Sequence, residues 1–366
     1  MPIQPIPRRA AGALATAALL GVSGAAVAID AEISGHVNRA IMVFDDGEDS
    51  ETAFVDGEPS NSRVRFRGTG ELGNGLTAGV YGEWELVSNN SSQVTIDDTD
   101  PSGSEFEVNE RHMDAFIQGG FGKLSLGQGD GAANGIAETD LSGTAIINYA
   151  GAGDLGGSIV FRDDGVAITD ASGDEVTIGG SYSQFDFESR FDRVRYDTPA
   201  FGPLQAAIGF GTKDNNDVTD AALRYSGEFA GGAELAAGLG YSTESRGGAE
   251  GSEETFGGSA SLLLPGGLNF TAVYTRQEND ADLDADTFYG KVGYRVGRHA
   301  VSVDYGITND LVDDDSEGEV YGVGYVFTPV NWAELYAGVK QHSLDLDGGS
   351  DPDDIVIATA GTRLKF

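Results

Sequence analysis

The sequence contains no cysteine and few basic residues. Without cysteine the chain can form no disulfide framework, no cysteine-ligated zinc site and no thiol nucleophile. Only 22 lysines and arginines stand against 59 aspartates and glutamates, a formal net charge of -37. This charge argues against a nucleic-acid-binding protein, because such proteins need a basic surface. Hydrophobic residues nevertheless make up 40% of the chain, too many for a disordered acidic protein.

A long uncharged apolar run occurs only near the N-terminus, at residues 10–29. Two arginines precede it, and the small residues Ala26-Val27-Ala28 resemble a cleavage site. We therefore predict a secretory signal peptide at residues 1–28, with a membrane anchor as the alternative, and an exported chain at residues 29–366. No later segment is apolar enough, over sufficient length, to cross a bilayer as a helix.

Beyond this run, apolar and polar residues alternate, which is typical of β-strands with two different faces. Short glycine-rich connections such as Gly73-Asn74-Gly75 alternate with longer acidic ones such as residues 44–61, which hold seven acids and no base. Counting between the connections predicts sixteen strands, at about 33–44, 62–70, 76–86, 111–118, 123–128, 190–198, 204–212, 221–229, 233–242, 255–263, 268–276, 286–296, 300–307, 319–327, 332–342 and 355–366.

This pattern predicts an all-β transmembrane antiparallel barrel. Lipid cannot hydrogen-bond an exposed sheet edge, so a sheet in a membrane must close on itself. Its tilted strands of about ten residues cross the hydrocarbon with one apolar face and one polar face. Short turns then lie in the periplasm and long acidic loops outside. A secreted β-sandwich would not explain the alternating connections, and a β-solenoid should show a fixed repeat, which is absent.

Several segments resemble the Gram-negative general porins. They are VNRAIM at 37–42, SRVRFRG at 62–68, ELGNGL at 71–76, GGFGKLSLG at 119–127, RVRYDTP at 193–199 and GTRLKF at 361–366. The resemblance implies a homotrimer of sixteen-stranded, water-filled barrels in the outer membrane. It also implies that the barrel-insertion machinery reads the terminal Phe366, and that a third external loop folds inward as a constriction.

That inward loop would be residues 128–189, which is longer than the family pattern leads us to expect. Residues 158–162 and 175–179 could form an extra hairpin within the additional segment, 157–180. The sequence leaves open whether this hairpin lies inside the pore or outside it.

Arginines recur at every second position in two predicted strands: Arg63, Arg65 and Arg67 in one, Arg193 and Arg195 in the other. Alternate residues share one face of a strand. Turning arginines towards lipid would cost about 2–4 kcal/mol each at mid-depth, so we predict that these side chains face the lumen. The resemblance adds Arg111 as another pore arginine, although simple alternation would then turn Asp114 outward.

The family pattern also implies an acidic inward loop opposite this positive wall. The candidate acids on that loop are Glu138 and Asp140. Opposed charges across a narrow gap produce a transverse field that sorts ions and orients dipolar solutes. Alternatively, the arginines pair with wall acids such as Glu83 and Glu85, which would also line the pore, and serve to fix the barrel shape. The two roles can overlap.

We therefore predict an outer-membrane porin for passive diffusion of small hydrophilic solutes and ions, with a charged constriction and a weak preference for cations. One alternative is a substrate-specific outer-membrane channel, and another is an exported soluble β-rich binding or adhesive protein. The expected partners are two further copies of the chain, outer-membrane lipid, lipopolysaccharide and small solutes, without nucleic acid.

No motif points to an enzyme, a cofactor or a metal ion. The chain has no G-x-S-x-G nucleophile motif, and its four histidines are far apart. Residues 345–351 lack the spacing of an EF-hand, and the G-x-G-x-x-G at 151–156 has no surrounding βαβ unit. We therefore expect no catalytic residue, no cofactor and no metal site.

Overall fold

The computed structural model describes residues 29–103, 106–246, 251–280, 284–347 and 350–366, so the expected signal peptide lies outside the described residues. The strands are β1 (Asp30–Asp45), β2 (Ser50–Asp56), β3 (Arg63–Gly73), β4 (Leu76–Val87), β5 (Glu107–Gly119), β6 (Gly122–Asp130), β7 (Arg162–Asp163), β8 (Val166–Ala167), β9 (Arg190–Asp197), β10 (Leu204–Lys213), β11 (Asn216–Glu228), β12 (Glu234–Ser245), β13 (Ser252–Leu263), β14 (Leu268–Asn279), β15 (Asp284–Val296), β16 (His299–Asn309), β17 (Glu317–Val330), β18 (Ala333–Asp345) and β19 (Ile355–Lys365). The short helices are η1 (Glu58–Ser60), η2 (Ala152–Asp154) and α1 (Ile178–Ser181). None of the described helices has the length and apolar character needed to span a membrane.

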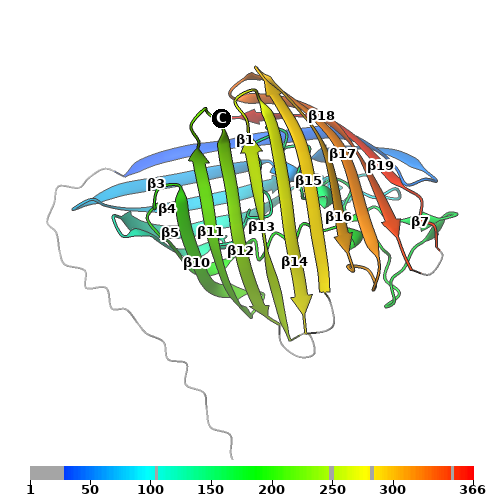
Figure 1. The fold of residues 1–366 in the computed structure, drawn as a ribbon, viewed down its shortest axis with the longest axis horizontal. Helices are drawn as coiled ribbons and strands as arrows, with labels where there is room; N and C mark the ends of the chain where they lie inside the picture. The colour runs from blue at the N-terminus through cyan, green and yellow to red at the C-terminus, as the bar shows by residue number, and fades with distance from the viewer. Residues whose placement is uncertain (1–28, 104–105, 247–250, 281–283, 348–349) are drawn as a thin grey trace, which may run out of the picture.

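The long strands form one closed antiparallel barrel (Figure 1). Barrel strands that follow one another along the chain are paired, and β19 returns to pair with β1 from His36↔Lys365 to Asp45↔Val356. Both β2 and β3 pair with β1, one after the other along its length, so they occupy one position in the wall. The sheet of 17 strands therefore has 16 wall positions, which confirms the predicted number.

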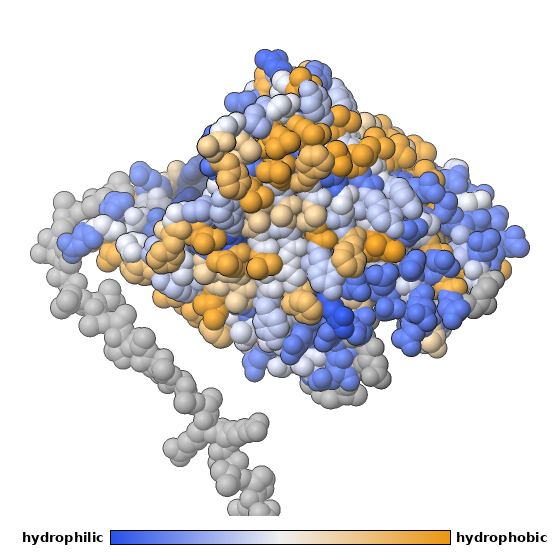
Figure 2. Space-filling model, in the orientation of Figure 1, coloured by the Kyte–Doolittle hydropathy of each residue, from blue (hydrophilic) through white to orange (hydrophobic). Residues whose placement is uncertain are grey.

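Successive side chains of each wall strand lie alternately on the outside and on the inside of the barrel. In β16, Val301 and Val303 are exposed on the outside, whereas Ala300 and Ser302 are buried on the inside. Exposed apolar residues recur on most of the other wall strands. Figure 2 shows hydrophobic residues gathered over the strands and hydrophilic ones over the end with the long connections. Such an apolar outer face suits contact with lipid acyl chains.

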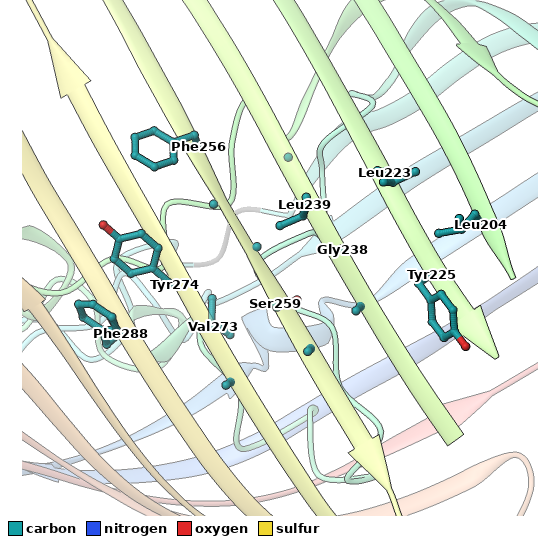
Figure 3. Close-up of a pocket in the computed structure, with 16 residues that line it drawn as sticks. Leu204, Leu223, Tyr225, Gly238, Leu239, Phe256, Ser259, Val273, Tyr274 and Phe288 are labelled. Atoms are coloured by element: carbon teal, nitrogen blue, oxygen red, sulfur yellow. The ribbon is translucent and has the colours of Figure 1, made fainter. Parts of the chain in front are cut away.

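The outer wall carries an apolar hollow of about 800 Å³ across β10–β15 (Figure 3). The register places three small residues side by side here: Ala237, Ala260 and Ala272. Larger side chains also line the hollow, among them Leu239, Phe256, Tyr274 and Phe288. Because outward-facing apolar side chains line it, the hollow belongs to the outer surface of the wall and not to the lumen.

Two connections differ from the sequence expectation. Residues 44–61 were expected to form a long loop, but β2 lies within them. Ala53 and Val55 bury their side chains on the inner face, whereas Thr52 and Phe54 are exposed on the outer face. The predicted strands 204–212 and 221–229 leave a longer connection, whereas only Asp214 and Asn215 separate β10 from β11. Both residues have positive φ, 51° and 70°, which aspartate and asparagine tolerate in a tight hairpin turn.

Residues 131–189, between β6 and β9, pass through the interior of the barrel. Ile178 N donates to Ile159 O at 3.0 Å and Phe161 N donates to Val176 O at 2.9 Å, so these two stretches pair antiparallel, with β7 and β8 beyond them. Their apolar side chains join a hydrophobic core with the inner faces of β1, β2 and β19, which includes Ile159, Phe161, Ile178, Met42, Phe44, Val55 and Ile357. The interior segment therefore fills one side of the lumen near the end with the long connections.

Candidate functional site

The arginines of β3 meet one carboxylate on the inner face of the wall. Arg63 donates to Glu83 of β4 (Nη1–Oε1 3.1 Å), as does Arg65 (Nε–Oε2 2.5 Å). Arg111 of β5 donates to the same carboxylate (Nε–Oε1 2.7 Å), and the Tyr81 hydroxyl does so at 2.9 Å. The Glu83 side chain is only 4% exposed. One buried carboxylate therefore holds three guanidinium groups in fixed positions.

A β-bulge explains how Arg111 and Asp114 can both face inward. The register between β4 and β5 shifts between Glu83 and Trp84, which leaves Arg111 as the extra residue. In a regular strand, Arg111 and His112 would point to opposite faces. The bulge instead turns Arg111 towards Glu83, while His112 and Asp114 remain buried. Simple alternation failed here because it assumes an unbroken register.

Carboxylates from other segments line the same cavity, which has a volume of about 650 Å³. Glu58 lies in the link between β2 and β3 and accepts a hydrogen bond from Asn90 Nδ2 at 2.7 Å. Asp186, in the interior segment, accepts from the backbone N–H groups of Gly135 and Ala137 at 2.7 and 2.9 Å. These bonds hold the acids in place across the cavity from the arginine wall.

The full charged lining is four arginines and six carboxylates: Arg63, Arg65, Arg111 and Arg190 with Glu58, Glu83, Asp130, Glu138, Asp154 and Asp186. With all of them ionised, the lining carries four positive and six negative charges, a formal net charge of -2. Positive and negative side chains lie close together in the lining, so the cavity can attract cations along one wall and anions along another.

The pKa values of several lining acids are raised. Burial raises the pKa of Glu58 to about 8, and the negative charges of Asp154 and Glu85 add to the effect. Burial also raises the pKa of Asp154 to about 6. Burial raises the pKa values of Glu138 and Asp186 above their ordinary values. The negative charge of Asp186 adds to the effect at Glu138, and that of Asp130 adds to it at Asp186. The charge of the cavity therefore changes with pH near neutrality.

The other predicted pore residues of the wall lie beside this cavity. Arg193 is buried and pairs with Asp114 (Nη2–Oδ2 2.7 Å). Arg195 pairs with Asp197 at 2.7 Å. Arg67 lies over an aromatic ring on the inner face of β5. Glu85 is 3.9 Å from Arg111. All are on the inner face, but they are not part of the cavity lining.

Asp140 has a different environment from the one expected. Its carboxylate pairs with Lys291 of β15, whose Nζ also donates to Asn148 O at 2.7 Å. The Lys291 side chain has no exposed surface, and that of Asp140 is 5% exposed. Asp140 therefore fastens the interior segment to the wall and does not line the cavity that holds Glu138.

Sequence reasoning missed five members of the lining: Glu58, Asp130, Asp154, Asp186 and Arg190. Arg190 begins a predicted strand, but alternation places it on the face opposite Arg193, so it carried no usable signal. The acids carried none, since each is one of many acids in a polar connection. Only the path of the chain through the barrel brings them together.

Comparison with known proteins finds the same architecture elsewhere. A family model described as Gram-negative porin matches residues 15–346. The anion-selective porin from Comamonas acidovorans is 18% identical with a TM-score of 0.59, and the match covers 93% of this chain and all of that one. Salmonella typhi OmpF, solved with daunomycin, is 14% identical with a TM-score of 0.62 over 92% of this chain and 97% of that one. OmpT of Vibrio cholerae in its trimer form is 13% identical, with a TM-score of 0.59 over 93% of this chain and all of that one. The search of curated protein sequences gave no match.

Proposed function

Because this chain belongs to the Gram-negative porin family and is an outer-membrane channel for passive diffusion, we propose that its charged cavity is the constriction that sorts solutes. One observation carries the proposal: four arginines and six carboxylates line a single cavity inside the barrel. Solutes that pass between the walls experience opposed charges at short range, which sorts ions and orients dipolar molecules. This step is physical and involves no chemical conversion.

The charge of the lining favours a weak preference for cations. Its formal value of -2, reached above about pH 8 where the buried acids are ionised, comes from groups in direct contact with the cavity. More distant charges contribute less, because salt screens them beyond about 10 Å at 0.1 M. The three arginines held by Glu83 oppose the preference and keep it small.

Reversal potentials across a planar bilayer under a KCl gradient test this proposal. At a pH above about 8, where the lining acids are ionised, we expect a weak cation preference in the wild-type channel. The preference should be stronger in Arg65→Ala, because the variant removes a positive charge from the lining. Arg298→Ala is the matched control, since it removes an arginine from a short turn outside the cavity. A clear anion preference of the wild type, or an unchanged preference in Arg65→Ala, would contradict the proposal.

Planar-bilayer recordings also distinguish passive diffusion from transport by a substrate-specific channel. Passive diffusion predicts that solute flux rises in proportion to solute concentration. Saturable block of the conductance by one solute would instead favour a dedicated binding track.

The quaternary structure and lipid contacts are further parts of the proposal. We infer a homotrimer, supported by the shared fold with OmpT of Vibrio cholerae in its trimer form. The apolar outer wall would contact lipid and lipopolysaccharide. Chemical cross-linking of the detergent-solubilised protein is expected to give a species of three times the monomer mass, and cross-linking that stops at the monomer would argue against the trimer.

A further inference from the structure

Three glutamates from separate segments meet on the inner face of the wall, outside the constriction. Glu188 lies at the end of the interior segment, two residues before β9, whereas Glu244 and Glu253 lie opposite each other in the β12–β13 ladder. One carboxylate oxygen from each residue lies within 4.8 Å of those from the other two. The three residues are buried, with exposed fractions of 4%, 3% and 6%. The fold therefore brings three anionic groups close enough to contact one small ion.

Two cations balance this cluster only in part. Lys213 Nζ lies 3.0 Å from Glu188 Oε2. Arg246 contacts Glu244 at 3.0 Å and Glu253 at 2.8 Å. Among the described residues no other cation is within ion-pair distance of these carboxylates, so two positive charges face three negative ones and a formal charge of -1 remains. Both cationic side chains reach solvent, with exposed fractions of 37% and 36%, so an incoming cation can displace them.

A buried hydroxyl beside the glutamates has no bonding partner. Ser242 is only 1% exposed, and its Oγ makes no hydrogen bond to any described residue. Ser242 lies two residues before Glu244 on the same inward face of β12, directly opposite Thr255 of β13. Leaving a buried polar group unpaired costs free energy, so such groups in proteins usually contact a water molecule or an ion. The hydroxyl is therefore an observation independent of the carboxylates.

Neighbouring groups leave the Ser242 hydroxyl facing the glutamates. Its register partner in β11 is Asp220, whose carboxylate turns the other way, towards β10. A Cβ on Gly209 of β10 would lie only 2.2 Å from Asp220 Oδ1. On the side away from the cluster, the ring of Phe187 covers Gly240, since a Cβ there would lie 2.6 Å from the ring Cζ. The side towards the three carboxylates is the one that remains.

Side-chain amides bring further oxygen atoms to the cluster. Asn216 Nδ2 donates to Glu244 at 2.8 Å, and Gln277 Nε2 donates to Glu253 at 3.2 Å. The oxygens of these two amides therefore lie beside the carboxylates. Three carboxylates, one hydroxyl and two amides offer six oxygen ligands. Calcium takes about six to eight such ligands in a flexible arrangement, whereas magnesium demands a near-ideal octahedron.

We propose that Glu188, Glu244 and Glu253 bind one calcium ion, with the Ser242 hydroxyl contacting the ion or its bound water. The ion takes the place of the two cationic side chains. Because Glu188 belongs to the interior segment, the ion fastens the end of that segment to β12 and β13. These strands are joined at the end with the long connections, which faces the medium in such barrels. The site is separate from the constriction and does not depend on how the constriction sorts solutes.

Equilibrium dialysis against radioactive calcium tests the site. The mature porin is refolded in detergent without lipopolysaccharide and dialysed in about 0.15 M KCl, which screens loosely held ions. We expect one ion per chain with a Kd of about 10⁻⁴–10⁻³ M, the range of extracellular calcium sites. Magnesium should bind about tenfold more weakly because it needs stricter geometry. Absence of saturable binding would overturn the site, and magnesium binding as tight as that of calcium would overturn the assignment to calcium.

Matched variants locate the bound ion. Glu188→Gln removes one charged ligand and should weaken calcium binding about tenfold or more. Ser242→Ala keeps every ion pair of the cluster and should weaken it about two- to tenfold, as loss of one neutral polar contact does. The control replaces residues 313–315, three exposed aspartates of another connection, with asparagine and should bind calcium as the wild type does. Wild-type affinity in both Glu188→Gln and Ser242→Ala would overturn the site.

Removing the competing cations separates a calcium site from a simple ion-pair network. Lys213→Gln/Arg246→Gln leaves three buried carboxylates without a cation, so the barrel should unfold at a lower temperature in EDTA. Calcium should bind this variant more tightly than the wild type and restore its unfolding temperature. Heat-dependent gel migration with and without calcium measures the rescue. A loss of stability that calcium does not restore would show that the glutamates serve only to pair with Lys213 and Arg246.

Discussion

At the residue scale, Glu83 connects the structure of the wall to the charge of the lumen. Its carboxylate accepts hydrogen bonds from three arginines and a tyrosine while almost fully buried. The two predicted roles of the arginines, lining the pore and pairing with wall acids, therefore belong to the same guanidinium groups. Pairing fixes the guanidinium groups, and the excess of three cations over one carboxylate leaves positive charge for the solute.

The Glu83→Gln variant tests this dual role. Removing one partner from a buried charge network costs about 3–5 kcal/mol, so the barrel should unfold at a lower temperature. The lining also loses one negative charge, so the reversal potential should shift towards anions. Heat-dependent gel migration measures the first effect and bilayer recording the second. A variant with wild-type stability would show that the arginines do not depend on Glu83.

Selectivity should also depend on pH. As the pH falls from well above 8 to well below 6, Glu58 and then Asp154 take up protons. Glu138 and Asp186, whose pKa values are also raised, lose negative charge as well. Cation preference should therefore be greatest above pH 8 and should decline towards pH 6. Reversal potentials measured across this range check the sign. In Glu58→Gln the change near pH 8 should be smaller, and a preference that grows on acidification would contradict the assignment.

At the scale of elements, a buried ion pair and a buried hydrogen bond hold the interior segment to the wall. Lys291 of β15 binds Asp140, and Lys340 of β18 lies 3.5 Å from Asp304 of β16 and donates to Asn148. The hydrophobic core around Phe161 also fastens the same segment to the wall. These contacts fix the position of the acids that face the arginines.

Lys291→Met tests this anchorage. The variant leaves Asp140 buried without its cation, at a cost of about 3–5 kcal/mol, so the segment should loosen and single-channel current should fluctuate more. Arg276→Met is the control, because Arg276 and its partners Glu278 and Asp284 are all substantially exposed, at 33%, 49% and 58%. Exposed pairs contribute only about 0–1 kcal/mol. Equal current noise in the two variants would argue against a special role for Lys291.

At the scale of the whole molecule, negative charge is unevenly distributed. Residues 310–316, one of the long connections, hold four acids, and Asp313, Asp314 and Asp315 among them are exposed. The lumen combines charges of both signs, because four arginines and six carboxylates line one cavity. The formal net charge of -37 therefore says little about what the narrow region prefers.

Salt concentration should separate these contributions. The screening length falls from about 30 Å at 0.01 M to about 3 Å at 1 M, so loop charge should affect selectivity only in dilute salt. Replacing Asp313, Asp314 and Asp315 with asparagine should lower cation preference at 0.01 M and leave it unchanged at 1 M. Arg65→Ala should alter it at both concentrations. Reversal potentials in the two salts measure this, and an effect of the loop variant at 1 M would contradict it.

The sequence alone determined the barrel. Two-residue alternation is a local property of the chain, and a strand that separates lipid from water must show it. It therefore predicted the sixteen wall positions and placed Arg63 and Arg65 on one face. It failed where the local rule breaks, at the bulge beside Arg111 and at the tight turn of Asp214 and Asn215.

Only the tertiary structure decided which charges meet. Asp140 and Lys291 are 151 residues apart, and Glu58 faces Asp186 only because the interior segment crosses the lumen. Such pairings depend on barrel closure and on the path of one long connection. Neither produces a repeating sequence pattern from which the pairing could be predicted. The wall can be predicted from the sequence because every strand faces lipid on one side and water on the other. The constriction cannot, because it depends on individual contacts between distant parts of the chain.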